Sequence, residues 1–326
     1  MTQPTIPPAP RPAPRPHAVA PEIALKAVDA RVEDVLDAVA LYDGEPYLVG
    51  SLAAGLGDHR SDIDVHVVSG GDRPAALDGP VLAFTPAGTC VDVRYLDRCT
   101  IDRVVGGRRP GHGARPAGRG DAWLLSRWLN AVPLRAGAPP LLDGGQRAQA
   151  VGLITTSLLA DLTALTAFAA LAERAGADRA WYLCRRAGTA AWELAAVLSG
   201  QYHLGERWLP ARSAAPEVAA LARDAGAARR AADLDGVLRR LGVDPAAAPG
   251  RVGLRVSPEA ERWTLAGEPF LLVAGRRLVP AVPSVPATVA DALDGDAAAV
   301  FAGLVNGALR WTVDVGGLTP RLEPTP

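Results

Sequence analysis

Apolar positions in the first third of the chain follow two different spacings. Between residues 22 and 40 they recur every three or four residues, which predicts a helix. Short apolar runs then predict four strands, at residues 47–49, 63–68, 81–84 and 90–96. Short strands mixed with helices predict a small mixed α/β sheet that ends near Ile101.

Helical spacing dominates the middle of the chain. Helices are predicted at about residues 121–132, 146–175 and 178–199, and two shorter ones after Pro216 and Asp233. The longest apolar stretch, residues 151–171, is interrupted by Asp161 and by threonines that form one polar stripe on a helix. This pattern favours a core helix over a membrane span.

The C-terminal part has a mixed pattern. Residues 262–273 and 276–280 predict a hairpin, residues 287–305 two short helices, and residues 308–315 a strand, which together suit a small winged-helix-like unit. The predicted fold class is therefore α+β: a small mixed-sheet domain, a helical bundle domain and a small C-terminal α/β unit. The predicted parts are a Pro-rich disordered leader (1–21), the sheet domain (22–104), an Arg/Gly-rich loop (105–120), the helical domain (121–249) and the C-terminal unit (250–326).

Composition narrows the setting. The 326 residues carry a net charge of -1, so no overall field draws the protein to nucleic acid or to an acidic membrane. The three cysteines are odd in number and lack metal-ligand spacing, which excludes a disulfide framework and a zinc site: Cys90, Cys99 and Cys184. With no signal-peptide pattern at the N-terminus, a cytoplasmic location is expected. Lys26 is the only lysine, so a phosphate-binding cation is expected to be an arginine.

The chemistry lies in residues 48–68. Asp62 and Asp64 flank Ile63 in a predicted strand, so their side chains project from the same face, roughly 6 to 7 Å apart. Asp92 alternates in the same way in a later strand. If the two strands are neighbours, three carboxylates converge, and oxygen ligands of this kind suit two Mg²⁺ ions about 3.5 to 4 Å apart.

Gly50 and Ser51 supply the complement to these carboxylates. Glycine lets the backbone approach a phosphate closely, and Ser51 is predicted to cap the helix that follows. Ser61, directly before the acidic pair, is included among the expected nucleotide contacts. The sequence therefore predicts metal ligands on one side of a site and a phosphate cradle on the other.

This pattern resembles the DNA polymerase β-like nucleotidyltransferase superfamily. That family has a Gly-Ser pair, a gap of about ten residues, an Asp-x-Asp strand and a later acidic residue, which here are Gly50, Ser51, Asp62, Asp64 and Asp92. The likeness covers residues 22–101, under a third of the chain. It implies transfer of a nucleoside monophosphate from a nucleoside triphosphate, with two Mg²⁺ or Mn²⁺ ions held by the three aspartates and pyrophosphate released.

A second resemblance lies at residues 205–209, which read Gly-Glu-Arg-Trp-Leu. The stretch is similar to Gly-Glu-Lys-Trp-Leu in bacterial nucleotidyltransferases with an all-helical C-terminal domain, some of which modify antibiotics. Arg207 stands where lysine is common. This keeps the positive charge, but it replaces the single ammonium group of lysine by the planar guanidinium, which can donate two parallel hydrogen bonds. The resemblance implies that Arg207 helps to hold the triphosphate and that the acceptor is a small molecule. The alternative is a turn anchored by Trp208.

Other readings stay open. The acceptor could be transfer RNA or a protein side chain, which the loop arginines Arg108, Arg109, Arg115 and Arg119 keep possible. A different class is a nucleotide-binding module without turnover. The oligomeric state and the base of the nucleotide stay open. The weaker candidate site residues are His66, His112, Arg185, Arg186 and Glu193.

Overall fold

The computed structural model describes residues 19–70, 81–106, 119–265, 268–273, 277–281 and 284–322. The chain divides into two compact units. The N-terminal unit consists of the described residues up to Ser157 together with Ala196–Arg212, and the C-terminal unit of Leu158–Ala195 and the described residues from Ser213 onward. Residues 121–157 and 196–212, which the sequence placed in a helical domain, therefore group with the sheet. Most of the predicted leader and of the Arg/Gly-rich loop, with His112, lies outside the described residues.

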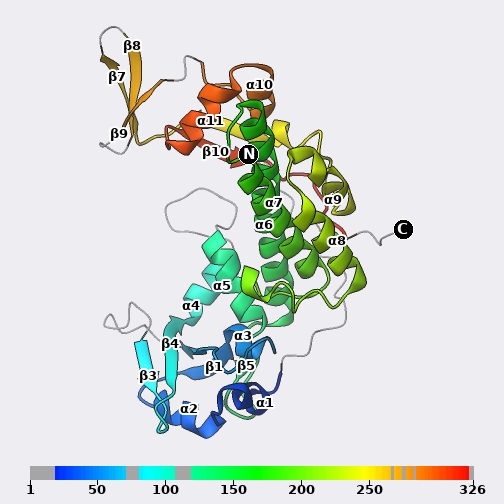
Figure 1. Cartoon of the computed structure of the whole chain (residues 1–326). Helices are drawn as coiled ribbons and strands as arrows, with labels where there is room; N and C mark the ends of the chain where they lie inside the picture. Colours follow the sequence, from blue (N-terminus) through cyan, green and yellow to red (C-terminus); the bar gives the residue numbers. More distant parts are fainter. Residues whose placement is uncertain are drawn as a thin grey trace. The chain divides into compact units, whose positions relative to one another are not determined.

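The N-terminal unit is built on a five-stranded mixed sheet, which confirms the predicted mixed α and β class (Figure 1). The strand order is β3-β4-β2-β1-β5, with β2 and β4 parallel and the other pairs antiparallel. The strands are β1 (Glu45–Val49), β2 (Ile63–Ser69), β3 (Val81–Phe84), β4 (Cys90–Asp97) and β5 (Val132–Pro133). The four strands predicted from apolar runs are present, and the two-residue β5 was not predicted.

The predicted helix at residues 22–40 is interrupted. It consists of α1 (Pro21–Leu25), the 3-10 turn η1 (Lys26–Val28) and α2 (Val32–Ala38). The chain breaks at Asp29, whose φ of 53° is left-handed, a conformation that aspartate adopts more readily than most residues. Apolar side chains of α1 and α2 still pack on one face of the sheet, because their spacing survives the break: Leu25, Val35, Ile63, Val65 and Val93 are buried in one cluster.

Helix α5 (Arg119–Leu129) packs on the opposite face of the sheet. Its Trp128 is fully buried, and the indole N–H donates to Nδ1 of His66 on β2 over 3.0 Å. Two shorter helices also belong to this unit: α3 (Gly50–Ala53) and α4 (Arg98–Val105). The Asp97 side chain caps α4 by accepting from the Thr100 N–H. Residues that point away from the α1–α2 core therefore face α5.

Long helices make up much of the remaining chain. They are α6 (Gly144–Arg174), α7 (Ala180–Leu198), α8 (Pro216–Ala227) and α9 (Asp235–Arg240), with 3-10 turns η3 (Glu206–Trp208), η4 (Ala231–Leu234) and η5 (Pro249–Arg251). In the described chain, α6 alone is long and apolar enough to cross a membrane by length and composition, but 67% of its most apolar window is buried inside the protein. That burial is typical of the core helix that the sequence predicted.

The C-terminal strands form two small sheets. Strand β6 (Val252–Val256) pairs antiparallel with β10 (Leu309–Val313), and the helices α10 (Val289–Asp294) and α11 (Ala297–Val305) lie between them in sequence. The predicted hairpin is a three-stranded meander of β7 (Ala260–Leu265), β8 (Glu268–Val273) and β9 (Arg277–Pro280). The strand predicted at 308–315 thus pairs with β6, which the sequence reading missed. The winged-helix likeness stays a prediction.

Candidate metal and phosphate site

Asp64 and Asp92 lie side by side on the sheet. Strands β2 and β4 are parallel, and Asp64 is the direct register partner of Asp92. Neighbouring strands lie about 4.7 to 4.9 Å apart, so the two Cα atoms are adjacent. On either side of them, the buried residues Ile63, Val65, Val91 and Val93 point into the α1–α2 core. Because side chains alternate along a strand, both carboxylates project from the other face.

Asp62 is not part of the strand. Strand β2 begins at Ile63, and Asp62 lies exposed in the segment before it. The prediction that Asp62 and Asp64 project from one regular strand is therefore wrong at its first residue, because pairing with β1 extends only to Asp64. Within the described residues, no group of three or more His, Cys, Asp or Glu side chains is placed to hold a metal ion. The geometry thus assembles two of the three predicted carboxylates.

Arg127 of α5 makes a fork onto Asp64. Its Nη1 donates to Oδ1 over 3.1 Å and its Nη2 to Oδ2 over 3.3 Å. Both side chains are mostly buried, at 16% and 13% exposed. The guanidinium also stacks on Trp123, 3.9 Å from the ring centroid. The sequence reading did not single out Arg127, because an arginine 63 residues away from its partner carries no motif.

The charges around Asp64 favour a bound cation. Burial raises the pKa of the Asp64 carboxyl, the Arg127 charge acts in the opposite direction, and the charges of Asp92 and Asp62 raise the pKa further. Negative charge is therefore concentrated at a partly desolvated point, and Arg127 balances it. Carboxylate oxygens gathered in this way are the donors that Mg²⁺ prefers, so Asp64 and Asp92 fit a divalent cation as a pair.

Gly50 lies against the Asp64 carboxylate. Its φ is 75°, and a Cβ built on it would overlap Oδ2 of Asp64. Only glycine allows this backbone to approach the carboxylate so closely. The predicted cap by Ser51 is wrong: α3 is a single turn whose N-cap is Val49, and no side chain caps it. A single turn has little dipole, so a phosphate cradle at Gly50 and Ser51 stays a prediction.

Ser61 and Arg207 meet at the turn before β2. Oγ of Ser61 accepts from the Asp58 N–H over 2.9 Å and donates to the Asp58 carboxylate over 3.3 Å. Arg207, in η3, reaches the same carboxylate through Nη2 over 3.0 Å, and its guanidinium lies 4.5 Å from the Trp208 ring centroid. The side chains of Arg207 and Asp58 are 58% and 45% exposed. Arg207 therefore lies beside the loop that leads to Asp62, paired with a carboxylate at the surface.

Buried nitrogens of the N-terminal unit without a hydrogen-bond partner among the described residues include Nε of Arg127 and Nδ1 of His203. His203 lies near Trp208, with ring centroids 6.4 Å apart. Burial, followed by the charges of Arg212 and Arg127, lowers the pKa of His203 to about 4, so the ring is neutral at pH 7. Unsatisfied buried polar groups call for an explanation, and a bound polar ligand is one.

His66 is a core histidine. Although it shares a face with Asp64, it is only 2% exposed, and burial together with the charges of Arg127 and Arg94 lowers its pKa to about 3. This weaker candidate for the site is therefore buried in the N-terminal unit, where the Trp128 indole donates to its ring. Glu193, Arg185 and Arg186 belong to the C-terminal unit, where Glu193 is buried in α7 and Arg185 is exposed.

Comparison with known proteins adds no family. No protein-family model matches the chain, and no curated protein is significantly similar to it. The interpretation of the site therefore rests on its residues and their geometry.

Proposed function

We propose that the N-terminal unit is a Mg²⁺-dependent nucleotidyltransferase. It would move a nucleoside monophosphate from a nucleoside triphosphate to a hydroxyl or amine of a small-molecule acceptor and release pyrophosphate. The observation that carries the proposal is the register pairing of Asp64 with Asp92 on parallel strands, with the Gly50 backbone against the Asp64 carboxylate. This arrangement places two carboxylates beside a backbone segment that only glycine can form.

The carboxylates are proposed as the cation ligands. Asp64 and Asp92, with Asp62 directly before β2, would hold Mg²⁺ or Mn²⁺, which when bound neutralises phosphate charge and activates the attacking group. The fork of Arg127 now engages both oxygens of Asp64. Arg127 would therefore release at least one of them as the site fills. Its unpartnered Nε is a donor that suits a phosphate oxygen.

Arg207 is proposed as a second triphosphate contact. It is exposed, held in place by stacking on Trp208, and its present partner is the surface carboxylate of Asp58. An exposed ion pair of this kind contributes little free energy, so a phosphate can replace Asp58 at low cost. Ser51 and Ser61, on the segments next to Gly50 and Asp62, are the proposed neutral donors to the nucleotide.

A nucleotide-binding module without turnover is the second candidate. The observation that favours it is the fork of Arg127 on Asp64, because an arginine that stays there would exclude a metal ion from both carboxylate oxygens. Transfer to tRNA or to a protein side chain is the alternative within the enzyme class. A cytoplasmic setting is proposed because free Cys90, Cys99 and Cys184 suit a reducing compartment.

The test combines the four nucleoside triphosphates, Mg²⁺ and an acceptor library. We expect pyrophosphate release and an acceptor whose mass rises by one nucleoside monophosphate. Asp64→Asn should abolish transfer, and Asp92→Asn should slow transfer more than it weakens triphosphate binding. Asp235→Asn, an exposed aspartate of the C-terminal unit, is the matched control and should leave the rate unchanged. Triphosphate binding without pyrophosphate release under any condition would favour the module instead.

A further inference from the structure

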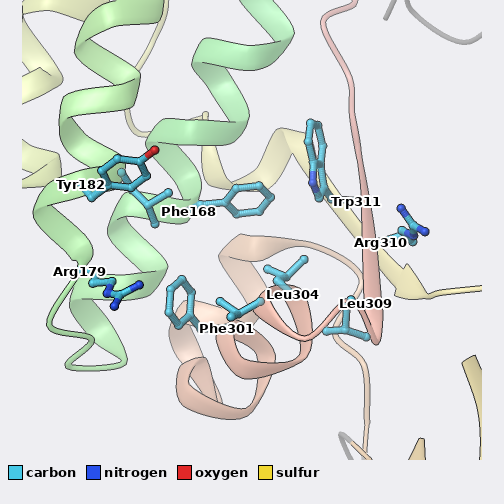
Figure 2. A pocket seen from close by; sticks show the side chains of 11 residues that line it. Phe168, Arg179, Tyr182, Phe301, Leu304, Leu309, Arg310 and Trp311 are labelled. Carbon is cyan, nitrogen blue, oxygen red and sulfur yellow. The ribbon is translucent and has the colours of Figure 1, made fainter. Parts of the chain in front are cut away.

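The C-terminal unit contains a pocket of about 430 Å³. It lies between α6, the start of α7, α11 and β10, all within that one unit. Figure 2 shows the Phe168 ring between Tyr182 on one side and Trp311 on the other, with Phe301 and Leu304 beneath it. The volume falls in the range of about 300 to 1,000 Å³ that is typical of small-molecule sites.

The walls of this pocket are aromatic and partly open to solvent. The rings of Phe168 and Trp311 meet edge to face, with centroids 5.5 Å apart. Tyr182 is 50% exposed and Trp311 is 42% exposed. Both are large amphipathic side chains, which bind well to flat apolar surfaces. A flat ring placed against them would cover apolar surface that the protein leaves in contact with water.

The charge around the pocket has one sign. Its lining residues include Arg179 and Arg310 but no aspartate or glutamate. Arg310 is held by Glu259, over 3.2 Å. The Arg179 side chain has no hydrogen-bond or ion-pair partner among the described residues, although it lies at one end of the pocket. Figure 2 shows the two guanidinium groups on opposite sides of the aromatic walls.

We propose that this pocket binds a flat aromatic molecule that carries a carboxylate or sulfonate group. The ring would lie against Tyr182, Phe168 and Trp311, and the anionic group would pair with Arg179, whose side chain has no partner among the described residues. This site is separate from Asp64 and Asp92 and does not depend on nucleotidyl transfer. Aromatic walls with one cationic end recognise the shape and the charge of such a ligand at the same time.

The test uses the fluorescent anion 8-anilinonaphthalene-1-sulfonate and its uncharged analogue N-phenyl-1-naphthylamine. We expect saturable binding of the anion at one site per chain and weaker binding of the neutral analogue. Arg179→Ala should weaken binding of the anion about three- to tenfold and leave the analogue unaffected, because it removes one exposed charged contact. Arg223→Ala removes another exposed arginine, from α8 and outside the pocket, and is the matched control.

A second variant tests the aromatic wall. Tyr182→Ala should weaken binding of both probes about tenfold, and since Tyr182 is half exposed, its loss should leave the melting temperature nearly unchanged. 2-Naphthoate should displace the fluorescent anion, and 2-naphthamide should do so only at about three- to tenfold higher concentration. The proposal is overturned if the anion does not bind, if Arg179→Ala and Tyr182→Ala bind it like the wild type, or if sedimentation shows a dimer that either variant dissociates.

Discussion

Replacing Arg127 with methionine tests whether Asp64 needs a cation beside it. The change removes the guanidinium but keeps an apolar chain that can still contact Trp123. It leaves Asp64 with the charges of Asp92 and Asp62 nearby and without its fork. We expect the metal-free variant to be less stable than the wild type.

The expected loss follows from the geometry of the pair. Two charge-assisted hydrogen bonds of 3.1 and 3.3 Å join side chains that are only 16% and 13% exposed. Removing one partner of a fully buried ion pair costs about 3 to 5 kcal/mol of folding free energy. Because Arg127 and Asp64 keep some contact with solvent, we expect Arg127→Met to cost about 2 to 4 kcal/mol. The loss should grow with pH, because the pKa of Asp64 is raised in the folded protein and rises further without Arg127. The folded protein therefore keeps this stability below the pKa that Asp64 has in the unfolded chain, and loses it as pH rises through the higher pKa of Asp64 in the folded protein.

The assay is urea unfolding of the wild type and the variant at pH 5 and pH 7.5, with and without Mn²⁺. Arg207→Met removes an exposed pair in the same unit and should cost less than about 1 kcal/mol. Mn²⁺ should stabilise Arg127→Met more than the wild type, because the ion then meets no competing guanidinium. An Arg127→Met protein as stable as Arg207→Met, with the wild-type response to Mn²⁺, would refute the reasoning.

Three further predictions concern other parts of the N-terminal unit. Gly50→Ala forces a Cβ onto the Asp64 carboxylate at a φ of 75°, so we expect a loss of at least about 1 to 2 kcal/mol in urea unfolding and a weaker Mn²⁺ response. The pKa of His203 is lowered to about 4, so the unfolded chain takes up the proton first as pH falls below 6.5. Between pH 7 and pH 5 the stability should then fall by about 2 kcal/mol more in the wild type than in His203→Gln, which keeps the similar contribution of His66. Arg207→Ala should weaken binding of the Mg²⁺–triphosphate about ten- to a hundredfold in calorimetry, or ~1.4 to 2.7 kcal/mol. An unchanged affinity would mean that residues 205–209 are a structural turn with no part in triphosphate binding.

The sequence predicted those features that repeat at a short period. Alternation in residues 63–68 and 90–96 indicated two strands with Asp64 and Asp92 on one face each, and the structure pairs them in register. The long helices were equally predictable, because their apolar stripes run over many turns. The first predicted helix is interrupted at Asp29, whose backbone is left-handed. The apolar spacing on either side of Asp29 is unchanged, so it could not predict this break.

The rest of the site depends on contacts between distant segments. Arg127 lies 63 residues from Asp64 in the chain, and His203 belongs to a segment that returns to the N-terminal unit after α7. Neither residue has a periodic or motif signal, so only the folded chain shows that Arg127 reaches Asp64 and that the Arg127 charge acts on His203. The short strand β5 escaped prediction for a related reason, since a two-residue strand has no pattern of its own.

Arg127 also explains how the Asp64 carboxylate can stay partly desolvated beside two other aspartates. Asp64 lies at a point where burial and two neighbouring aspartates all disfavour its charge, so without a cation it would take up a proton or lose its place. The fork of Arg127 supplies that cation and fixes both oxygens. Under the proposed function, a metal ion that binds there would exchange one cation for another, and the strength of the two Arg127–Asp64 hydrogen bonds would set the cost of that exchange. The arginine that stabilises Asp64 would then weaken binding of the first divalent ion, and the released guanidinium would be available to the phosphates.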